Sequence, residues 1–197
     1  MSKTLLIVFV KNNIIGKVKT RLAKTVGDNK AFEVYKQLID ITEECSLKVD
    51  SDKHIYFSEK VITSKWVDEL KFVQQGNSLG DRMSNAFENG FKQGYEKVIL
   101  IGSDLPEISP SIIQEGFDKL EKSEVVFGPA EDGGYYLIGM KKSRKFIFEN
   151  KPWSETGLLE ITLDELGKQD VSFSLLQTLN DIDTFEDLKS SKLYNNA

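Results

Sequence analysis

The sequence predicts an α/β fold with a mostly parallel, mixed central sheet and helices on both faces. Short apolar runs rich in β-branched residues alternate along the chain with longer segments whose apolar residues recur at helical spacing. The first of these runs, residues 4–10 (TLLIVFV), is continuously apolar, which is typical of a parallel strand buried on both faces. Such alternation favours a parallel sheet wrapped by helices.

The composition indicates one ordinary globular domain over residues 1–197. Apolar residues make up 40% and charged residues 29% of the chain. Cys45 is the only cysteine, and no apolar run approaches the ~20 residues that span a bilayer, so we expect a cytoplasmic protein without disulfides or a membrane span. The net charge of -5 argues against nucleic acid as a partner but is compatible with a local phosphate pocket.

The first half of the chain is predicted to begin with the strand over residues 4–10 and a basic loop over residues 11–24. Apolar residues at helical spacing then predict a helix over residues 28–48, with Asp28 as its N-cap. The next elements are a strand, a short helix or turn, a short strand, a helix and a strand, at residues 54–58, 66–70, 71–74, 79–95 and 97–101.

In the second half, Ser109 and Pro110 predict the start of a helix that runs to about residue 120, because proline suits the first turn. Two strands, a helix and a strand follow, at residues 124–127, 135–140, 155–167 and 171–177. A closing helix over residues 184–189 has Thr184 as N-cap and Asp187 at the capping-box position.

Ligands of such sheets bind beyond the carboxyl ends of the strands, so function is expected in the loops after Val10, Ile101 and Phe127. The loop after Val10 holds Lys11, Gly16, Lys19 and Arg21, and its N–H groups and basic side chains suit phosphate oxygens. It lacks the first glycine of a Walker A loop. A solvated lysine-rich loop is the alternative.

The loop after Ile101 contains Ser103 and Asp104. A carboxylate at this point can bind a hard cation that bridges phosphates, so Asp104 is a candidate ligand for Mg²⁺ or Mn²⁺. A turn former or helix cap is the alternative role. Asp181 and Asp183 offer further acids, although capping of the last helix is the simpler interpretation unless they face Asp104.

Glycines and an acid in GPAEDGG, residues 128–134, suggest a close approach of ligand to backbone, with Glu131 or Asp132 binding an acceptor hydroxyl or acting as base. A plain hairpin turn is the alternative. Arg82 can reach a phosphate or base or be an ordinary exposed arginine, and Trp153 can stack on a sugar or base or belong to the core.

His54 is the only histidine and lies within a predicted strand, so we interpret it as structural or surface. A Ser-His-Asp or Cys-His hydrolase is therefore disfavoured, and a conventional zinc site is excluded by a single cysteine and a single histidine.

Taken together, these motifs resemble the bacterial GT-A-fold proteins known as glycosyltransferase-like. Those proteins are relatives of the guanylyltransferases that act on 2-phospholactate and on molybdenum cofactor. The resemblance runs from Leu5 to about Leu188. It rests on ordered blocks: KTRL at 19–22, LGDRM at 79–83, GSDLP at 102–106, EDGGYYLIG at 131–139, PWS at 152–154 and DIDTFEDL at 181–188.

The resemblance implies a Rossmann-like GT-A fold, a basic loop over the phosphates, a metal carboxylate at Asp104 helped by Asp183, and an acceptor side lined by Asp132. The catalytic candidates are then Asp104, Asp132, Arg21 and Lys19. The nucleotide-binding candidates are Lys11, Gly16, Lys19, Arg21, Gly80, Arg82 and Ser103. Two departures occur: residues 12–15 (NNII) replace the prolines usual in the first loop, and Phe185 replaces a proline of the last block.

The predicted function is that of a Mg²⁺-dependent transferase acting on a nucleotide-activated substrate, glycosyltransferase-like and using an NDP-sugar with a small-molecule acceptor. A nucleotidyltransferase that releases pyrophosphate from an NTP is the alternative, and the first loop lacks the paired glycines usual in guanylyltransferases. A nucleotide-binding module without turnover and a purely structural protein are other classes. The base, sugar, acceptor, oligomeric state and choice between Asp181 and Asp183 as second metal ligand stay open.

Overall fold

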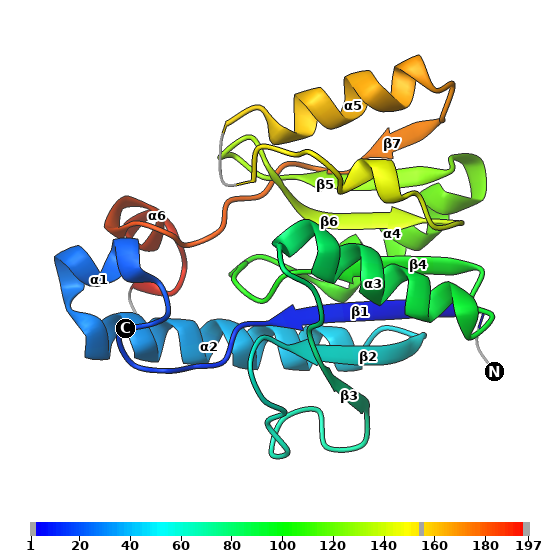
Figure 1. Ribbon diagram of the computed structural model, residues 1–197. Helices are drawn as coiled ribbons and strands as arrows, with labels where there is room; N and C mark the ends of the chain where they lie inside the picture. The colour runs from blue at the N-terminus through cyan, green and yellow to red at the C-terminus, as the bar shows by residue number, and fades with distance from the viewer. Residues whose placement is uncertain (1–2, 154–155, 195–197) are drawn as a thin grey trace.

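The computed structural model describes residues 3–153 and 156–194, which form a seven-stranded mixed sheet with helices on both faces (Figure 1). The strand order is β3-β2-β1-β4-β6-β5-β7. The strands are β1 Thr4–Val10, β2 Asp52–Phe57, β3 Leu70–Val73, β4 Lys97–Ile101, β5 Val125–Pro129, β6 Tyr135–Met140 and β7 Phe173–Leu175. The helices are α1 Thr20–Val26, α2 Asp28–Leu47, α3 Leu79–Lys92, α4 Pro110–Lys122, α5 Leu158–Lys168 and α6 Phe185–Ser190, with a 3₁₀ turn η1 at Lys145–Ile147.

The sheet is mostly parallel, as predicted. β1 pairs in parallel with β2 and β4, β2 with β3, and β5 with β7. β6 is antiparallel to both of its neighbours, β4 and β5, because a short hairpin connects it to β5. The loops that follow β1, β4 and β5 therefore emerge at one edge of the sheet.

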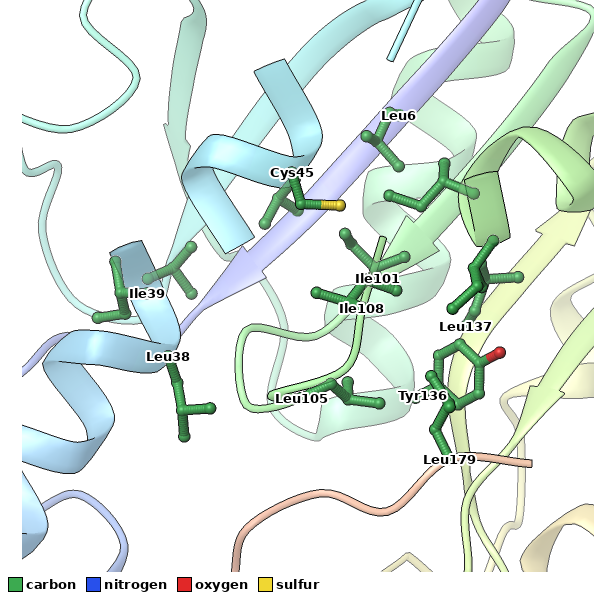
Figure 2. Close-up of a cluster of buried hydrophobic side chains, with 14 of the residues drawn as sticks. Leu6, Leu38, Ile39, Cys45, Ile101, Leu105, Ile108, Tyr136, Leu137 and Leu179 are labelled. Atoms are coloured by element: carbon green, nitrogen blue, oxygen red, sulfur yellow. The ribbon is translucent and has the colours of Figure 1, made fainter. Parts of the chain in front are cut away.

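Alternate residues of β1 pack on opposite faces of the sheet, which explains its continuous apolar sequence. Leu6, Val8 and Val10 belong to the cluster that contains the apolar faces of α2 and α4. Figure 2 shows part of that cluster, to which α2 contributes Leu38 and Cys45, β1 contributes Leu6, β4 contributes Ile101 and β6 contributes Leu137. Leu5, Ile7 and Phe9 face the second cluster, under α3 and α5.

Several predicted boundaries match the structure. β1, β4 and β6 have the predicted limits, and α4 begins at Pro110 with the Ser109 hydroxyl accepting from the Ile112 N–H. The predicted capping box of the last helix is also present, since Thr184 and Asp187 each accept a backbone N–H of the other. Of the short helix or turn predicted for residues 66–70, the structure has a turn over residues 66–69, and Leu70 already belongs to β3.

Other predictions were wrong at the ends of elements. The basic loop stops at Lys19, because α1 begins at Thr20, so Arg21 lies on a helix. Asp28 is the first residue of α2, and the N-cap is Gly27 with a φ of 82°, a conformation that favours glycine. α1 carries no side-chain cap and is stabilised by packing on α2, which local sequence signals do not record.

Two further elements are shorter than predicted. α5 begins at Leu158 rather than at residue 155, which lies outside the described residues. β7 covers only Phe173–Leu175, after which the chain continues beside β5 through single hydrogen bonds, including that from the Leu179 N–H to the Pro129 carbonyl. Within the described part of the chain, no helix combines the length and apolarity that a bilayer crossing requires.

Candidate functional site

A buried lysine joins the two acidic segments that the sequence singled out. The Nζ of Lys19 donates to Oδ2 of Asp104 at 3.0 Å and to Oδ1 of Asp183 at 3.1 Å. The Lys19 side chain is 5% exposed, whereas those of Asp104 and Asp183 are 38% and 41% exposed. The loops after β1 and β4 and the segment before α6 therefore meet at the predicted edge of the sheet.

The acids around Lys19 outnumber the basic groups, and this shifts ionisation. Burial alone would lower the pKa of Lys19, but the carboxylates of Asp104, Asp183 and Asp181 raise that pKa above its ordinary value. Burial and the nearby Asp104 carboxylate raise the pKa of Asp181 to about 7, although Lys19 opposes this. Lys19 is thus a permanent cation among acids that repel one another.

Backbone and hydroxyl contacts hold the three segments together. The Ile182 N–H donates to the Asp104 carbonyl at 3.3 Å. The Tyr35 hydroxyl, on α2, lies 2.9 Å from the Ser103 hydroxyl and hydrogen-bonds both the N–H and the carbonyl of Lys11, at 3.0 and 3.1 Å. Ser103 is buried, so its hydroxyl serves this network.

Tyr35 was missed as a site residue, because its place in the apolar spacing of the helix marked it only as core. Its hydroxyl joins the loops after β1 and β4 to α2, and burial raises its pKa to about 12. No local sequence signal distinguishes such a tyrosine from a packing residue.

The other basic-loop residues lie at the surface beside this cluster. Arg21, in the first turn of α1, places Nη1 3.4 Å from Oδ2 of Asp183, and its side chain is exposed. Lys11 and Gly16 are exposed, and Gly16 has a φ of 78°, which favours glycine. The structure therefore brings Lys19 and Arg21 to the acids and leaves Lys11 and Gly16 on the outer part of the loop.

A cavity of about 330 Å³ adjoins the cluster at the carboxyl ends of the strands. Its described lining contains three carboxylates, those of Asp104, Asp132 and Asp181. The rest of the lining is chiefly apolar or aromatic: Phe9, Leu79, Met83, Leu100, Leu105, Ala130, Tyr135, Tyr136, Ile138, Trp153 and Leu158, with Gly102 and Gly134. This size suits a small-molecule site.

Asp132 belongs to a hairpin turn and also lines the cavity. It lies in the β5–β6 hairpin connection, where its Oδ1 accepts from the Gly134 N–H at 2.8 Å and Gly133 has a φ of 88°. The side chain is also exposed and lines the cavity. The hairpin-turn interpretation is thus correct, and it leaves the second carboxylate oxygen available to a ligand.

Gly80 and Arg82 lie apart from the Lys19 cluster. Gly80 is buried, and a Cβ there would lie 2.4 Å from the Phe148 carbonyl oxygen and 3.0 Å from the ring of Trp153. This glycine therefore lets the segment before α5 pack against the start of α3. The Nε of Arg82 donates to the Gly76 carbonyl at 3.2 Å, and Arg82 is not among the described residues lining the cavity.

His54 was interpreted as structural or surface, and the structure places it in the interior. It is fully buried, and its ring lies 5.0 Å from that of Phe72 and 5.7 Å from that of Tyr95. Its position on β2 is remote from the cavity lining.

The oxygen atoms of the carboxylates at this site are of the kind that binds a hard divalent cation. The candidate donors are all carboxylate oxygens, and Mg²⁺ takes one or two protein carboxylates while phosphates and waters complete its shell. In residues 3–153 and 156–194, no group of three or more His, Cys, Asp or Glu side chains is arranged as a metal site. A cation here would therefore depend on ligand oxygens as well as on protein carboxylates.

Comparisons with known proteins agree with this architecture. The model of the family described as "Uncharacterized protein conserved in bacteria (DUF2064)" matches residues 45–155. A structure from Desulfovibrio desulfuricans G20, described as a "putative nucleotide-diphospho-sugar transferase", is 30% identical, with a TM-score of 0.88 over 98% of this chain and 90% of that one. No curated protein sequence matches the chain.

More distant structures share the fold. The 4-diphosphocytidyl-2C-methyl-D-erythritol synthase from Anaerococcus prevotii DSM 20548 is 12% identical, with a TM-score of 0.61 over 99% of this chain and 100% of that one. The inositol-1-phosphate CTP transferase from T. maritima is 16% identical, with a TM-score of 0.53 over 98% and 94%. The fold prediction is thus confirmed, while the specific relationship to the two kinds of guanylyltransferase stays a prediction.

Proposed function

We propose that this chain, which belongs to the family described as "Uncharacterized protein conserved in bacteria (DUF2064)", is a transferase acting on a nucleotide-activated substrate. The reaction we favour is glycosyl transfer from an NDP-sugar to a small-molecule acceptor. The 30% identity with a structure described as a "putative nucleotide-diphospho-sugar transferase" supports this choice.

The observation that carries the proposal is the contact of Lys19 with both Asp104 and Asp183 beside the cavity. A buried ammonium that bonds two partly exposed carboxylates keeps those carboxylates oriented before any substrate binds. Carboxylates oriented in advance would let a bound cation offset charge on a diphosphate leaving group without reorganisation at the moment of reaction. Arg21, whose side chain is exposed and lies against Asp183 through Nη1, would contact phosphate oxygens through its other N–H groups.

In the proposed reaction, an acceptor hydroxyl or amine attacks the anomeric carbon of the sugar. The bond between that carbon and the phosphate oxygen breaks, and the nucleoside diphosphate leaves with the bonding electrons. Asp132 accepts the acceptor's proton through the oxygen that the Gly134 N–H does not bind. Holding both reactants in the cavity lowers the entropic part of the barrier.

Asp104, with Asp181 or Asp183, would hold Mg²⁺ or Mn²⁺ in this site. The bound cation would offset negative charge on the diphosphate. The protein's own contribution is to keep the carboxylates charged and oriented, which Lys19 does through its two hydrogen bonds.

Nucleotidyl transfer is the second candidate, because two structures that share the fold are a cytidylyl-type synthase and a CTP transferase by description. In that reaction an acceptor phosphate attacks the α-phosphate of an NTP and pyrophosphate leaves. It requires a site that tolerates an anionic acceptor.

The test is calorimetric titration of UDP-glucose, a GDP-sugar, UTP and GTP, with and without Mg²⁺. The wild type is compared with Asp104→Asn, and Asp118→Asn, an exposed acid of α4, serves as the matched control. We expect Mg²⁺-dependent binding that Asp104→Asn weakens by about tenfold or more and that Asp118→Asn leaves unchanged.

The preferred ligand separates the two reactions, because glycosyl transfer requires an NDP-sugar and nucleotidyl transfer an NTP. If a folded wild type binds none of the four nucleotides, the proposal of a nucleotide-dependent transferase is wrong.

A further inference from the structure

A buried asparagine joins the loop after β1 to the loop after β2. The Asn12 side-chain oxygen accepts from the backbone N–H groups of Glu59 and Lys60, at 2.7 and 3.2 Å, and its amide nitrogen donates to the Lys60 carbonyl at 2.8 Å. The Ser58 hydroxyl accepts from the Asn12 N–H at 2.9 Å and donates to the Asn12 side-chain oxygen at 3.2 Å. Asn12 is buried, so removal of its amide would leave backbone groups with partners that water replaces poorly.

These contacts fix the start of the loop after β1 from two sides. The Tyr35 hydroxyl holds the N–H and the carbonyl of Lys11, while Asn12 is bound to the loop after β2. Residues 12–15 (NNII) contain no proline, so no ring restricts the backbone of this segment. The order of the segment therefore depends on contacts made by side chains.

The middle of the same loop is a tight turn over residues 14–17. The Lys17 N–H donates to the Ile14 carbonyl at 2.9 Å. Gly16 has a φ of 78°, and Ile15 is not among the residues with a positive φ. These features define a type II turn, and the second position of such a turn, which Ile15 occupies, is one that proline fits.

The far end of the loop carries the basic groups of the candidate site. Val18 is buried in the cluster that contains the apolar face of α2, and Lys19 contacts Asp104 and Asp183. Lys19 has a φ of 46°, a left-handed conformation that residues other than glycine adopt where surrounding contacts hold it. α1 begins at the next residue and has no side-chain cap. The placement of Lys19 and Arg21 therefore depends on the anchored loop before them and on the packing of α1.

We propose that Asn12 is a positioning residue of the candidate site. Through the loop after β2 it orders the loop after β1, and it thereby holds Lys19 against the two carboxylates and Arg21 beside them before a nucleotide binds. Asn12 lies outside the described lining of the cavity, so it acts through these residues rather than on the ligand. This inference rests on the proposed function, since it assigns the loop to the phosphates of a nucleotide.

The first test compares Asn12→Ala with Asn13→Ala, the same replacement at the adjacent asparagine, which is partly exposed. Affinities for UDP-glucose, a GDP-sugar, UTP and GTP are measured by calorimetry with Mg²⁺, after urea unfolding has shown each variant to be folded. Ordering one more backbone residue on binding costs about tenfold in affinity, so Asn12→Ala should bind the nucleotide of the wild type about tenfold more weakly. Asn13→Ala should stay within about twofold of the wild type. Equal affinities of Asn12→Ala and the wild type would overturn the inference.

A proline variant separates ordering of the loop from a general loss of stability. Ile15→Pro restricts the turn without restoring any hydrogen bond of Asn12, and Ile15 is 56% exposed, so the ring meets solvent. Added to Asn12→Ala, this change should recover about threefold in affinity, whereas alone it should change affinity by less than about twofold. If the double variant binds no better than Asn12→Ala, the role of the asparagine is only structural and the inference is wrong.

The NMR signal of the Lys19 ammonium provides a measurement without nucleotide, and its absence in Lys19→Met assigns it. A buried ammonium bonded to two carboxylates exchanges its protons slowly with water, so the signal should be sharp in the wild type. It should broaden in Asn12→Ala and sharpen again when Ile15→Pro is added. A signal that stays unchanged in Asn12→Ala would contradict the inference.

Ser58→Ala is the milder variant should Asn12→Ala fail to fold, because it removes one hydroxyl of the network and is expected to weaken nucleotide binding by about threefold. Failure of this inference and failure of the proposed function give different results. If a nucleotide binds and the variants at Asn12 and Ser58 change neither affinity nor the Lys19 signal, only this inference is wrong. If no nucleotide binds the folded wild type, the proposed function is wrong, and the Lys19 signal alone decides whether Asn12 holds that lysine.

Discussion

Replacing Asp104 and Asp183 together by asparagine is expected to destabilise the protein more than replacing Lys19 by methionine. The difference follows from exposure, because Lys19 is 5% exposed while its two partners are 38% and 41% exposed. Loss of the lysine leaves carboxylates that water can hydrate. Loss of both carboxylate charges leaves a buried ammonium whose two hydrogen-bond partners are neutral.

The magnitudes follow from these contacts. A hydrogen bond to a charged group contributes about 1.5–3 kcal/mol, and the asparagine oxygens retain part of each bond, so the double variant should lose about 2–4 kcal/mol. Lys19→Met should lose about 1–2 kcal/mol, since the exposed carboxylates regain water while their mutual repulsion increases. Added Mg²⁺ should recover part of the second loss by reducing that repulsion.

The assay is urea unfolding at fixed ionic strength, from which the free energy of unfolding is extrapolated. Asp118→Asn, at an exposed acid whose Oδ1 accepts from the Gln114 side-chain amide, is the control and should stay within about 0.5 kcal/mol of wild type. A Lys19→Met variant that is less stable than the double asparagine variant would refute the argument from exposure.

Three other outcomes are expected. Gly80→Ala should cost about 1–3 kcal/mol, because its Cβ would lie 2.4 Å from the Phe148 carbonyl oxygen, whereas Gly167→Ala, where a Cβ meets nothing within 4 Å, should be neutral or stabilising in thermal unfolding. Burial lowers the pKa of His54, so below about pH 6.5 the unfolded chain binds a proton that the folded chain resists. The free energy of unfolding should therefore decrease as the pH is lowered, by up to about 1.4 kcal/mol per pH unit, and it should decrease less in His54→Phe. If the free energy of unfolding falls equally at acid pH in the wild type and in His54→Phe, this role of His54 is excluded. Tyr35→Phe keeps the ring but removes a hydroxyl that hydrogen-bonds two loops, so urea unfolding should show a loss of about 1–2 kcal/mol, and an unchanged midpoint would count against the network.

Much of the secondary structure was predictable, because the signals that specify it are local. The apolar run of β1 and the strand β4 were placed with their observed limits, and the capping box of Thr184 and Asp187 was recognised from spacing alone. Each of these features depends on residues within a few positions of one another. The alternation of such elements also determined the class of fold.

Element ends without a local signal were predicted poorly. α1 has neither a side-chain cap nor acidic residues in its first turn, so nothing in its sequence separates it from the basic loop. β7 covers only Phe173–Leu175, after which the chain stays beside β5 through single hydrogen bonds such as that from the Leu179 N–H to the Pro129 carbonyl, and no local pattern marks this change.

The sequence by itself determined which residue types stand at the ends of β1 and β4, and hence that Lys19 and Asp104 were candidates. Only the tertiary structure decided that their side chains meet each other and Asp183, across separations of 85 and 164 residues. The same holds for the Tyr35 hydroxyl and for the seat of Trp153 against Gly80. Local patterns encode burial and turn chemistry over a few residues, whereas these contacts depend on strand order, which the packing of the whole sheet and its helices sets.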